Sequence, residues 1–206
     1  MAQKITSLQN PLIKLLIKQL TKHDNLMLIE SFKVIKEIID SKKFDILFNK
    51  HKPTVVIGVP TLFEAILSNN NIKNLDLSHI KYAISGGDLL PKSLEDRVNE
   101  YLESHNSKAR ISQGYGLTEA LAAVCLAHDE LNKSGSIGIP FPGNYIKIID
   151  PATRKSLPFN EIGEICIHTK GLMMGYLNNE SETNVALQVH EDGYVWLHTG
   201  DLGLMD

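Results

Sequence analysis

The chain has 206 residues, enough for one large domain or two small ones. Its hydrophobic content of 43% and charged content of 22% are those of an ordinary globular protein. No apolar run approaches the roughly 18 residues of a membrane span, and the first residues lack the apolar core of a signal peptide. These features exclude a membrane-spanning or disordered chain, and we expect a cytoplasmic location.

The charge is unevenly distributed along the chain. Residues 1–50 carry nine lysines against five acidic residues, whereas residues 51–206 carry 12 basic and 19 acidic residues. The formal net charge of −3 therefore combines an excess of +4 with one of −7. Two interpretations stay open: two units with different partners, or lysine-rich helices whose charges simply face solvent.

The first elements come from hydrophobic spacing. Within residues 1–43 the pattern predicts a helix from Ser7 to about Leu20, a strand over 26–29 and a helix over 32–39. Further elements are strands over 54–59, 80–85 and 109–113, helices that begin at Pro60 and Pro91, and a helix that Thr118 opens. Alternating helices and nearly continuous apolar strands predict an α/β fold, with a parallel sheet covered by helices on both faces.

The pattern changes after Ser134, where glycine and proline become frequent. Short strands are predicted over 145–149, 163–168 and 194–197. Their spacing indicates a small antiparallel β region that follows the parallel sheet.

Two glycine turns follow predicted strands directly. One is Gly86-Gly87-Asp88, and the other is the loop 113–119, Gln-Gly-Tyr-Gly-Leu-Thr-Glu. Because ligands of open parallel sheets bind at the carboxyl ends of the strands, both turns should open onto one edge of the sheet. Tyr115 offers a ring for stacking on a base, and Thr118 caps a helix whose N-terminus favours phosphate. Glu119 suits Mg²⁺, although a tight loop before a capped helix explains these residues equally well.

A second carboxylate follows far downstream, in Thr199-Gly200-Asp201. It suits the hydroxyl groups of a ribose. Together the loop 113–119 and Asp201 are typical of a site that holds a nucleotide.

The loop 113–119 resembles the core motif of the adenylate-forming, AMP-binding enzymes, which include the acyl-CoA synthetases. Other segments are similar to motifs of that family and occur in its order: residues 53–63, 85–91, 135–143, 163–165, 171–178 and 196–203. The matches extend from about Phe44 to Asp206. The run 171–178 most resembles the fatty acyl-CoA synthetase branch, the long-chain fatty-acid–CoA ligases.

The resemblance implies a role for each matching residue. Those that would bind the nucleotide are Gly86, Gly87, Asp88, Gln113, Gly114, Tyr115, Gly116 and Asp201. Tyr115 would stack on adenine, Asp201 would bind the ribose, and Gly114 and Gly116 would border the acyl pocket. Thr118 would touch the α-phosphate and Glu119 would hold Mg²⁺, which makes these two the expected catalytic residues.

The implied reaction joins a carboxylic acid, here a fatty acid, to coenzyme A with ATP and Mg²⁺, and releases AMP and pyrophosphate. A fatty substrate would also bring peripheral association with a membrane. The family's glycine-rich phosphate loop has no counterpart in residues 1–43, which contain no glycine, and the chain ends at Asp206 without the family's C-terminal domain and its lysine. We therefore expect a truncated fragment without ligase activity alone, with an uncovered apolar sheet face. The alternative is a non-catalytic protein that still binds nucleotide.

Residues 1–43 resemble a different family, the substrate-binding start of SpoU/TrmH-type RNA methyltransferases. A lysine-rich helix there precedes a short strand and a helix, and a basic face suits RNA. An ordinary pair of amphipathic helices is the open alternative. The expected domains are thus a basic segment (1–43), a parallel α/β subdomain (44–133) and a β-rich subdomain (134–206).

The cysteines and histidines show no metal-binding spacing. Cys125 and Cys166 are expected to be buried as small apolar groups. The eight histidines are scattered along the chain, and His198 is expected to be structural or to lie at the rim of the nucleotide site.

Overall fold

The computed structural model describes residues 44–72, 74–120, 123–127 and 132–206. The predicted elements within residues 1–43 lie outside this part of the chain. Two compact units are distinguished: one takes the described residues among 1–52 and 68–75, and the other takes 53–67 and 76–206. The domain boundaries at 44 and 134 stay predictions.

The smaller unit holds helix α3, Phe44–His51, and the short 3-10 helix η2, Asn70–Ile72. Phe44 and Phe48 lie one helical turn apart, and their ring centroids are 6.2 Å apart. Both rings are buried, together with Leu47 and Ile72. The unit therefore has its own small apolar core.

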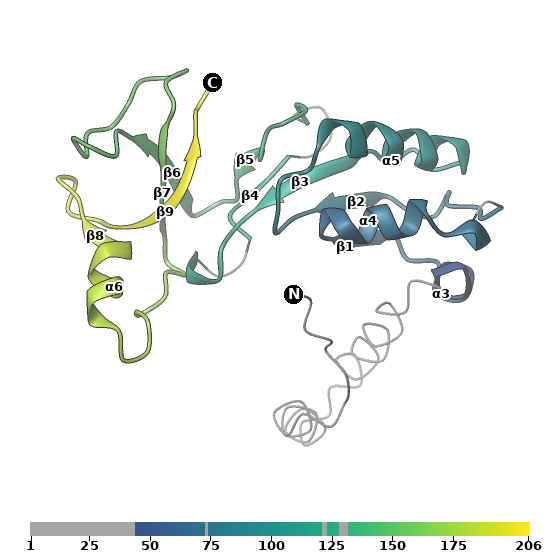
Figure 1. The fold of residues 1–206 in the computed structure, drawn as a ribbon, viewed down its shortest axis with the longest axis horizontal. Coiled ribbons are helices and arrows are strands. Elements are labelled where there is room, and N and C mark those ends of the chain that lie inside the picture. Colours follow the sequence, from purple (N-terminus) through teal and green to yellow (C-terminus); the bar gives the residue numbers. More distant parts are fainter. Residues whose placement is uncertain (1–43, 73, 121–122, 128–131) are drawn as a thin grey trace. The chain divides into compact units, whose positions relative to one another are not determined.

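The larger unit contains the predicted parallel strands, which are β1, Val55–Gly58, β2, Tyr82–Ser85, and β3, Ile111–Tyr115 (Figure 1). The helices α4, Pro60–Leu67, and α5, Lys92–Ser104, connect them. Pro60 occupies the first position of α4, where a missing N–H costs nothing. These elements, with the separate antiparallel sheet, confirm the predicted α/β fold.

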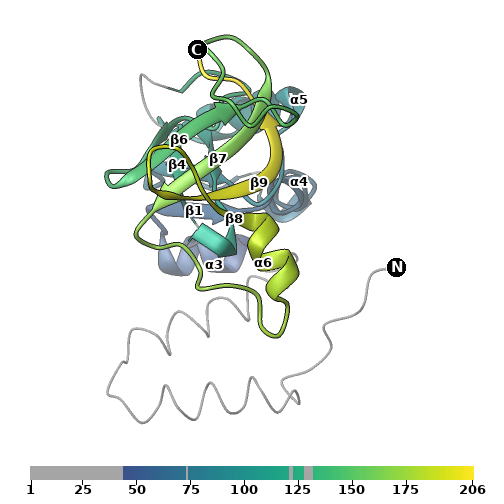
Figure 2. The same ribbon diagram turned by 90° about the vertical axis from the view of Figure 1, so that its left-hand side faces the viewer.

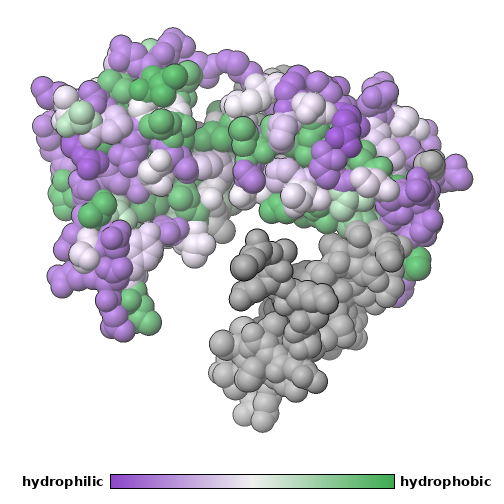
Figure 3. Space-filling view, in the orientation of Figure 1, coloured by the Kyte–Doolittle hydropathy of each residue, from purple (hydrophilic) through white to green (hydrophobic). Residues whose placement is uncertain are grey.

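The two connecting helices lie side by side. Arg97 of α5 pairs with Glu64 of α4 through two hydrogen bonds of 2.8 and 2.9 Å. Leu94, Val98 and Leu102, spaced four residues apart, bury one stripe of α5. Hydrophobic side chains, in green in Figure 3, are also visible among the hydrophilic ones over this region. Within the larger unit, the helical layer predicted for the second face of the sheet is not found among the described residues.

That second face is apolar and exposed. Val55 pairs with Tyr82 and Ile57 with Ile84, so these four side chains share one face. Ile57 is 66% exposed and Tyr82 49%. The uncovered apolar face expected from the sequence is therefore present.

The strand order changes after β3. Strands β4, Cys125–Leu126, and β5, Ile139–Pro140, extend the sheet as antiparallel neighbours, in the order β1-β2-β3-β4-β5. The segment 116–124 is too short for a crossover helix, which needs a dozen or more residues. The helix predicted from Thr118 is wrong: the structure has a single 3-10 turn, η3, Thr118–Ala120. Pairing of β4 with β3 overrides the helix propensity of the alanine-rich sequence.

A separate antiparallel sheet has the order β6-β7-β9-β8. Its strands are β6, Asn144–Ile149, β7, Gly163–Thr169, β8, Leu187–Val189, and β9, Val195–Gly203. Figure 2 shows β6, β7 and β9 with helix α6, Glu180–Ala186, close to β8. The predicted antiparallel region is confirmed, whereas α6, β8 and the full length of β9 were not predicted.

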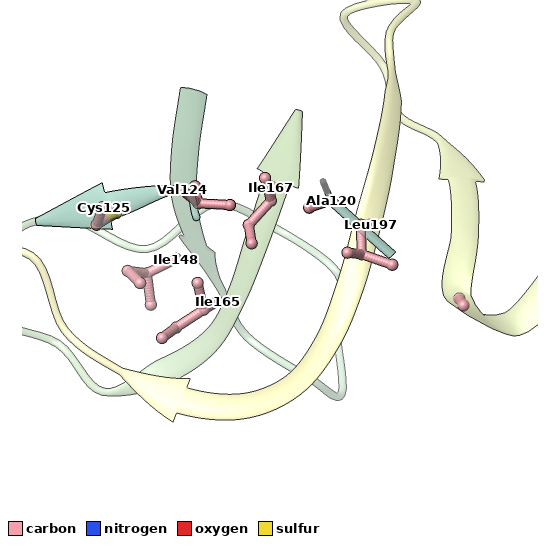
Figure 4. Close-up of a cluster of buried hydrophobic side chains, with 8 residues drawn as sticks. Ala120, Val124, Cys125, Ile148, Ile165, Ile167 and Leu197 are labelled. Atoms are coloured by element: carbon pink, nitrogen blue, oxygen red, sulfur yellow. The ribbon is translucent and has the colours of Figure 1, made fainter. Parts of the chain in front are cut away.

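One buried cluster joins the antiparallel sheet to the chain around β4. Val124 and Cys125 pack with Ile165, Ile167 and Leu197 (Figure 4). Both cysteines of the chain are free and buried, as expected. Burial raises the pKa of the Cys125 thiol to about 11. No described helix is long and apolar enough to cross a membrane.

Candidate nucleotide site

The two glycine segments lie next to each other at the carboxyl ends of β2 and β3. The amide of Gly86 donates to the carbonyl oxygen of Gly58 at 2.9 Å. A Cβ atom on Gly86 would lie 3.5 Å from the carbonyl oxygen of Gly114, so backbone meets backbone here. Gly87 has a φ of +78°, and exposed Asp88 accepts a hydrogen bond from the Leu89 amide at 2.7 Å. The common edge expected for the two segments is therefore formed.

The first part of the motif belongs to a strand. Gln113 lies in β3, as predicted, and Gly114 and Tyr115 extend this strand, which corrects the expectation of a loop that includes them. Gln113 is 8% exposed, and its Oε1 accepts a hydrogen bond from the Leu90 amide at 3.3 Å. This side chain holds the turn after β2 against β3. Gly116 follows the strand and is half-buried.

Tyr115 and Asp201 meet across the two sheets. The hydroxyl of Tyr115 donates to Oδ2 of Asp201 at 2.6 Å. The ring is half-buried, whereas Asp201 is exposed. Burial, and then the Asp201 carboxylate, raise the pKa of Tyr115, so this hydroxyl stays protonated as a donor.

A bulge in β9 positions Asp201. Cys166 pairs with His198 and Glu164 with Leu202, so β9 has two extra residues opposite Ile165. The Thr199 hydroxyl donates to the Ile165 carbonyl oxygen at 2.8 Å, and Gly200 has a φ of +75°. The Asp201 amide donates to Oγ1 of Thr199 at 3.1 Å. The bulge therefore directs the Asp201 side chain out of the regular alternation of the strand.

Glu119 is held by the segment that precedes α6. The Tyr176 hydroxyl donates to Oε1 of Glu119 at 2.9 Å, and the Met173 amide donates to the Glu119 carbonyl oxygen at 2.8 Å. The Glu119 carboxylate raises the pKa of Tyr176. In the described part of the chain no group bonds Oε2 of Glu119. One carboxylate oxygen is thus oriented and the other is available to a cation, which fits the oxygen ligands that Mg²⁺ prefers.

Thr118 lies beside Glu119 with its side chain exposed. It does not begin an α-helix, so a helix N-terminus does not support phosphate binding at this point. The roles of Thr118, Glu119 and the other motif residues with a nucleotide stay predictions. Tyr176 was not among the candidate site residues: it lies in the family-like run 171–178, but only the fold brings it to Glu119.

Comparison with known proteins identifies the family. The family model "AMP-binding enzyme" matches residues 34–177, and the chain belongs to this family. A 4-coumarate–CoA ligase of Solanum tuberosum is 39% identical over 192 residues, covering 88% of this chain and 34% of that protein. This chain thus spans about a third of the length of such curated relatives. The match gives no support to the RNA methyltransferase resemblance of residues 1–43.

Solved structures share the fold. A long-chain-fatty-acid-CoA ligase from Archaeoglobus fulgidus superposes with a TM-score of 0.74 at 26% identity, covering 81% of this chain and 35% of that one. The ATP-bound MatB of Rhodopseudomonas palustris gives a TM-score of 0.67 at 26% identity, covering 81% and 31%. The named CoA ligases act on 4-coumarate and on long-chain fatty acids, so the relatives do not single out fatty acids.

Proposed function

We propose that this chain forms the nucleotide-binding part of an AMP-forming CoA ligase, which activates a carboxylic acid with ATP and passes the acyl group to coenzyme A. The hydrogen bond between Tyr115 and Asp201, two of the residues expected to hold the nucleotide, is the observation that supports it most directly. Tyr115 belongs to the run 113–119, which also holds Glu119, whereas Asp201 comes from the bulge in β9.

The chain's own residues would act mainly by positioning the nucleotide and the acid for reaction. The Tyr115 ring would stack on adenine, and Asp201 would exchange its bond with the Tyr115 hydroxyl for bonds to the ribose hydroxyls. Thr118 would touch the α-phosphate, which the acid's carboxylate attacks. Mg²⁺, held by Glu119, would neutralise charge on the phosphates. Gly114 and Gly116 leave room for the acyl group.

The acid itself is proposed from the relatives. The 4-coumarate–CoA ligases at 39% identity favour an aromatic propenoic acid of the 4-coumarate type. The run 171–178 and the A. fulgidus ligase at 26% identity favour a long-chain fatty acid as the second candidate. Peripheral membrane association belongs to that second candidate alone, and a cytoplasmic location is proposed for both.

Calorimetry with the whole chain tests the proposal. The titrants are AMP and two non-hydrolysable acyl-adenylate analogues, one with a 4-coumaroyl and one with a long-chain fatty acyl group. We expect both analogues to bind, the 4-coumaroyl one more tightly. The Asp201→Ala variant should bind AMP and both analogues more weakly than the wild type does. An adenylate that binds equally well to Asp201→Ala would refute the assignment of the site. Pyrophosphate release with ATP, Mg²⁺ and either acid then distinguishes a catalytic chain from one that only binds nucleotide.

A further inference from the structure

A cysteine and two histidines converge on the antiparallel sheet, away from the residues assigned to the nucleotide. Cys166 of β7 lies directly opposite His198 of β9, and His190 follows β8, the other neighbour of β9. Cys166 Sγ lies 3.8 Å from Nδ1 of His198, and the Nε2 atoms of His190 and His198 are 2.9 Å apart. One donor atom from each residue fits within 4.8 Å of the other two.

The cluster is enclosed but reachable. Cys166 is fully buried and His198 is 9% exposed, whereas His190 is half-buried. His190 begins the turn to β9, which is closed by hydrogen bonds between His190 and Tyr194 and between Gly193 and His190. Access is therefore from the side of this turn.

Groups around the cluster orient one of its rings. Oε2 of Glu164 lies 3.0 Å from Nδ1 of His198, and Nη1 of Arg154 lies 2.8 Å from the same nitrogen. A carboxylate on one ring nitrogen is the usual partner of a histidine whose other nitrogen binds a metal. Because Nδ1 is engaged in this way, Nε2 is the nitrogen that faces His190. Two Nε2 atoms at 2.9 Å need either a proton or a metal ion between them.

We propose that Cys166, His190 and His198 form a three-ligand site for a thiophilic divalent ion of the Zn²⁺ type. Thiolate and imidazole together are ligands that Zn²⁺ favours. Binding would release the Cys166 proton to solvent and leave a fourth position for water. Zn–N bonds of about 2.0 Å and a Zn–S bond of about 2.3 Å set the donors roughly 3.3–3.6 Å apart. The present separations, 2.9 Å between the two Nε2 atoms and up to 4.8 Å within the cluster, require the three side chains to adjust to reach that spacing.

The positive charge of Arg154 opposes the ion and must be accommodated. Its side chain is 51% exposed and also pairs with Glu164 at 3.4 Å. The guanidinium can therefore stay with the carboxylate, or turn to solvent, when a cation occupies the cluster. In either case Arg154 leaves Nδ1 of His198, and Glu164 holds the ring of His198.

The test uses the whole chain, freed of metal with a chelator and titrated with Co²⁺ and then Zn²⁺. We expect one Co²⁺ per chain, a thiolate-to-cobalt absorption band and its loss when Zn²⁺ is added. Cys166→Ser should remove the band, and His190→Gln should weaken Co²⁺ binding at least about 10-fold. Cys125→Ala and His168→Gln are matched controls outside the cluster and should bind as the wild type does.

Two results would overturn the site: no band in the folded wild-type chain, or a band that survives Cys166→Ser or that forms in His190→Gln with the Co²⁺ affinity of the wild type. Circular dichroism establishes that each variant is folded. If Cys166→Ser does not fold, the part-exposed His190→Gln variant decides. These outcomes are independent of nucleotide binding, so the metal site and the proposed function fail separately.

Discussion

The Tyr115 hydroxyl and the Asp201 carboxylate are joined by a hydrogen bond of 2.6 Å, although the two residues are 86 positions apart in the chain. The bond links the end of β3 to the bulge in β9. It also places the expected stacking ring next to the expected ribose acceptor. We propose that the ring of Tyr115 and the carboxylate of Asp201 contact different parts of the nucleotide, and substitutions of each residue test this.

We expect Tyr115→Phe to retain AMP binding within about threefold, because the ring that stacks on adenine is kept. Tyr115→Ala removes a base–aromatic stack of about 1–3 kcal/mol and should weaken binding roughly 5- to 150-fold. Calorimetric titration of AMP measures both. Equal losses in the two variants would mean that the hydroxyl, not the ring, carries the contribution of Tyr115.

Asp201→Ala removes hydrogen bonds to a charged acceptor, each of about 1.5–3 kcal/mol. AMP affinity should fall at least about 10-fold. Binding of 2′,3′-dideoxyadenosine monophosphate, which lacks the ribose hydroxyls, should be weak already and change little in this variant. A similar loss for both nucleotides would contradict a ribose-binding role.

Tyr176→Phe tests the orientation of Glu119. Without the hydroxyl that bonds Oε1, the carboxylate is free to rotate, and partners of this kind typically change metal affinity 10- to 100-fold. We expect Mg²⁺-dependent ATP binding to weaken by about 10-fold, while AMP binding in a chelator stays unchanged. Tyr194→Phe, at an exposed tyrosine just before β9, is the control. If AMP binding without metal weakens as much, Tyr176 supports the fold instead.

The parallel half of the fold was readable from the sequence because its signals are local. Val55 to Gly58 is a run of apolar, mostly β-branched residues, and Pro60 begins the following helix where its ring is tolerated. Helix α5 shows its buried stripe at regular spacing. The same apolar runs explain the exposed apolar face of β1. A strand that is apolar on both sides needs a cover on each of its faces.

The missed elements lack such local signals. Strands β4 and β5 have two residues each, too few for any alternation, and α6 is a polar segment identified mainly by the Asn179 cap that accepts from the Glu182 amide. The helix predicted from Thr118 failed because strand pairing outweighed local propensity.

Parts of the site depend on tertiary contacts in the same way. The bond between Gln113 and Leu90, the approach of Tyr176 to Glu119 and the gathering of Cys166 with His190 and His198 join segments far apart in the chain. Spacing along the sequence carries no trace of such contacts. Motif matching therefore proposed residues for the nucleotide site but identified neither their partners nor the cluster of Cys166, His190 and His198.

The stability of the chain should depend on the charge of Asp76. Its carboxylate accepts hydrogen bonds from the amide and hydroxyl of Ser78 and from Asn106, and these lower its pKa, the Ser78 amide most. A folded-state pKa below the unfolded value means that the ionised group stabilises the fold above about pH 4 and that this contribution is lost as pH falls through the lowered value.

Asp76→Asn keeps the size of the side chain and removes that dependence. We expect its urea midpoint to be lower at pH 7 and to fall less steeply than that of the wild type between about pH 5 and 3. Glu161→Gln, an exposed carboxylate in a turn, serves as the control for a general change of charge. Parallel acid profiles for Asp76→Asn and the wild type would contradict a stabilising role of this charge.

Two glycines of the family-like segment 135–143 should respond differently to the same substitution. Gly135 and Gly138 both have positive φ, +79° and +81°. A Cβ on Gly135 meets nothing within 4 Å, whereas one on Gly138 would overlap the backbone of Leu126 and Ala127, next to the β4–β5 pair. Gly135→Ala should therefore lower the free energy of unfolding only by the strain of an alanine at positive φ, about 1–2 kcal/mol. Gly138→Ala adds a backbone clash and should cost at least about 3 kcal/mol of the free energy of unfolding. Urea unfolding at pH 7 measures both, and equal losses would show that the chain around β4 yields to the added methyl group.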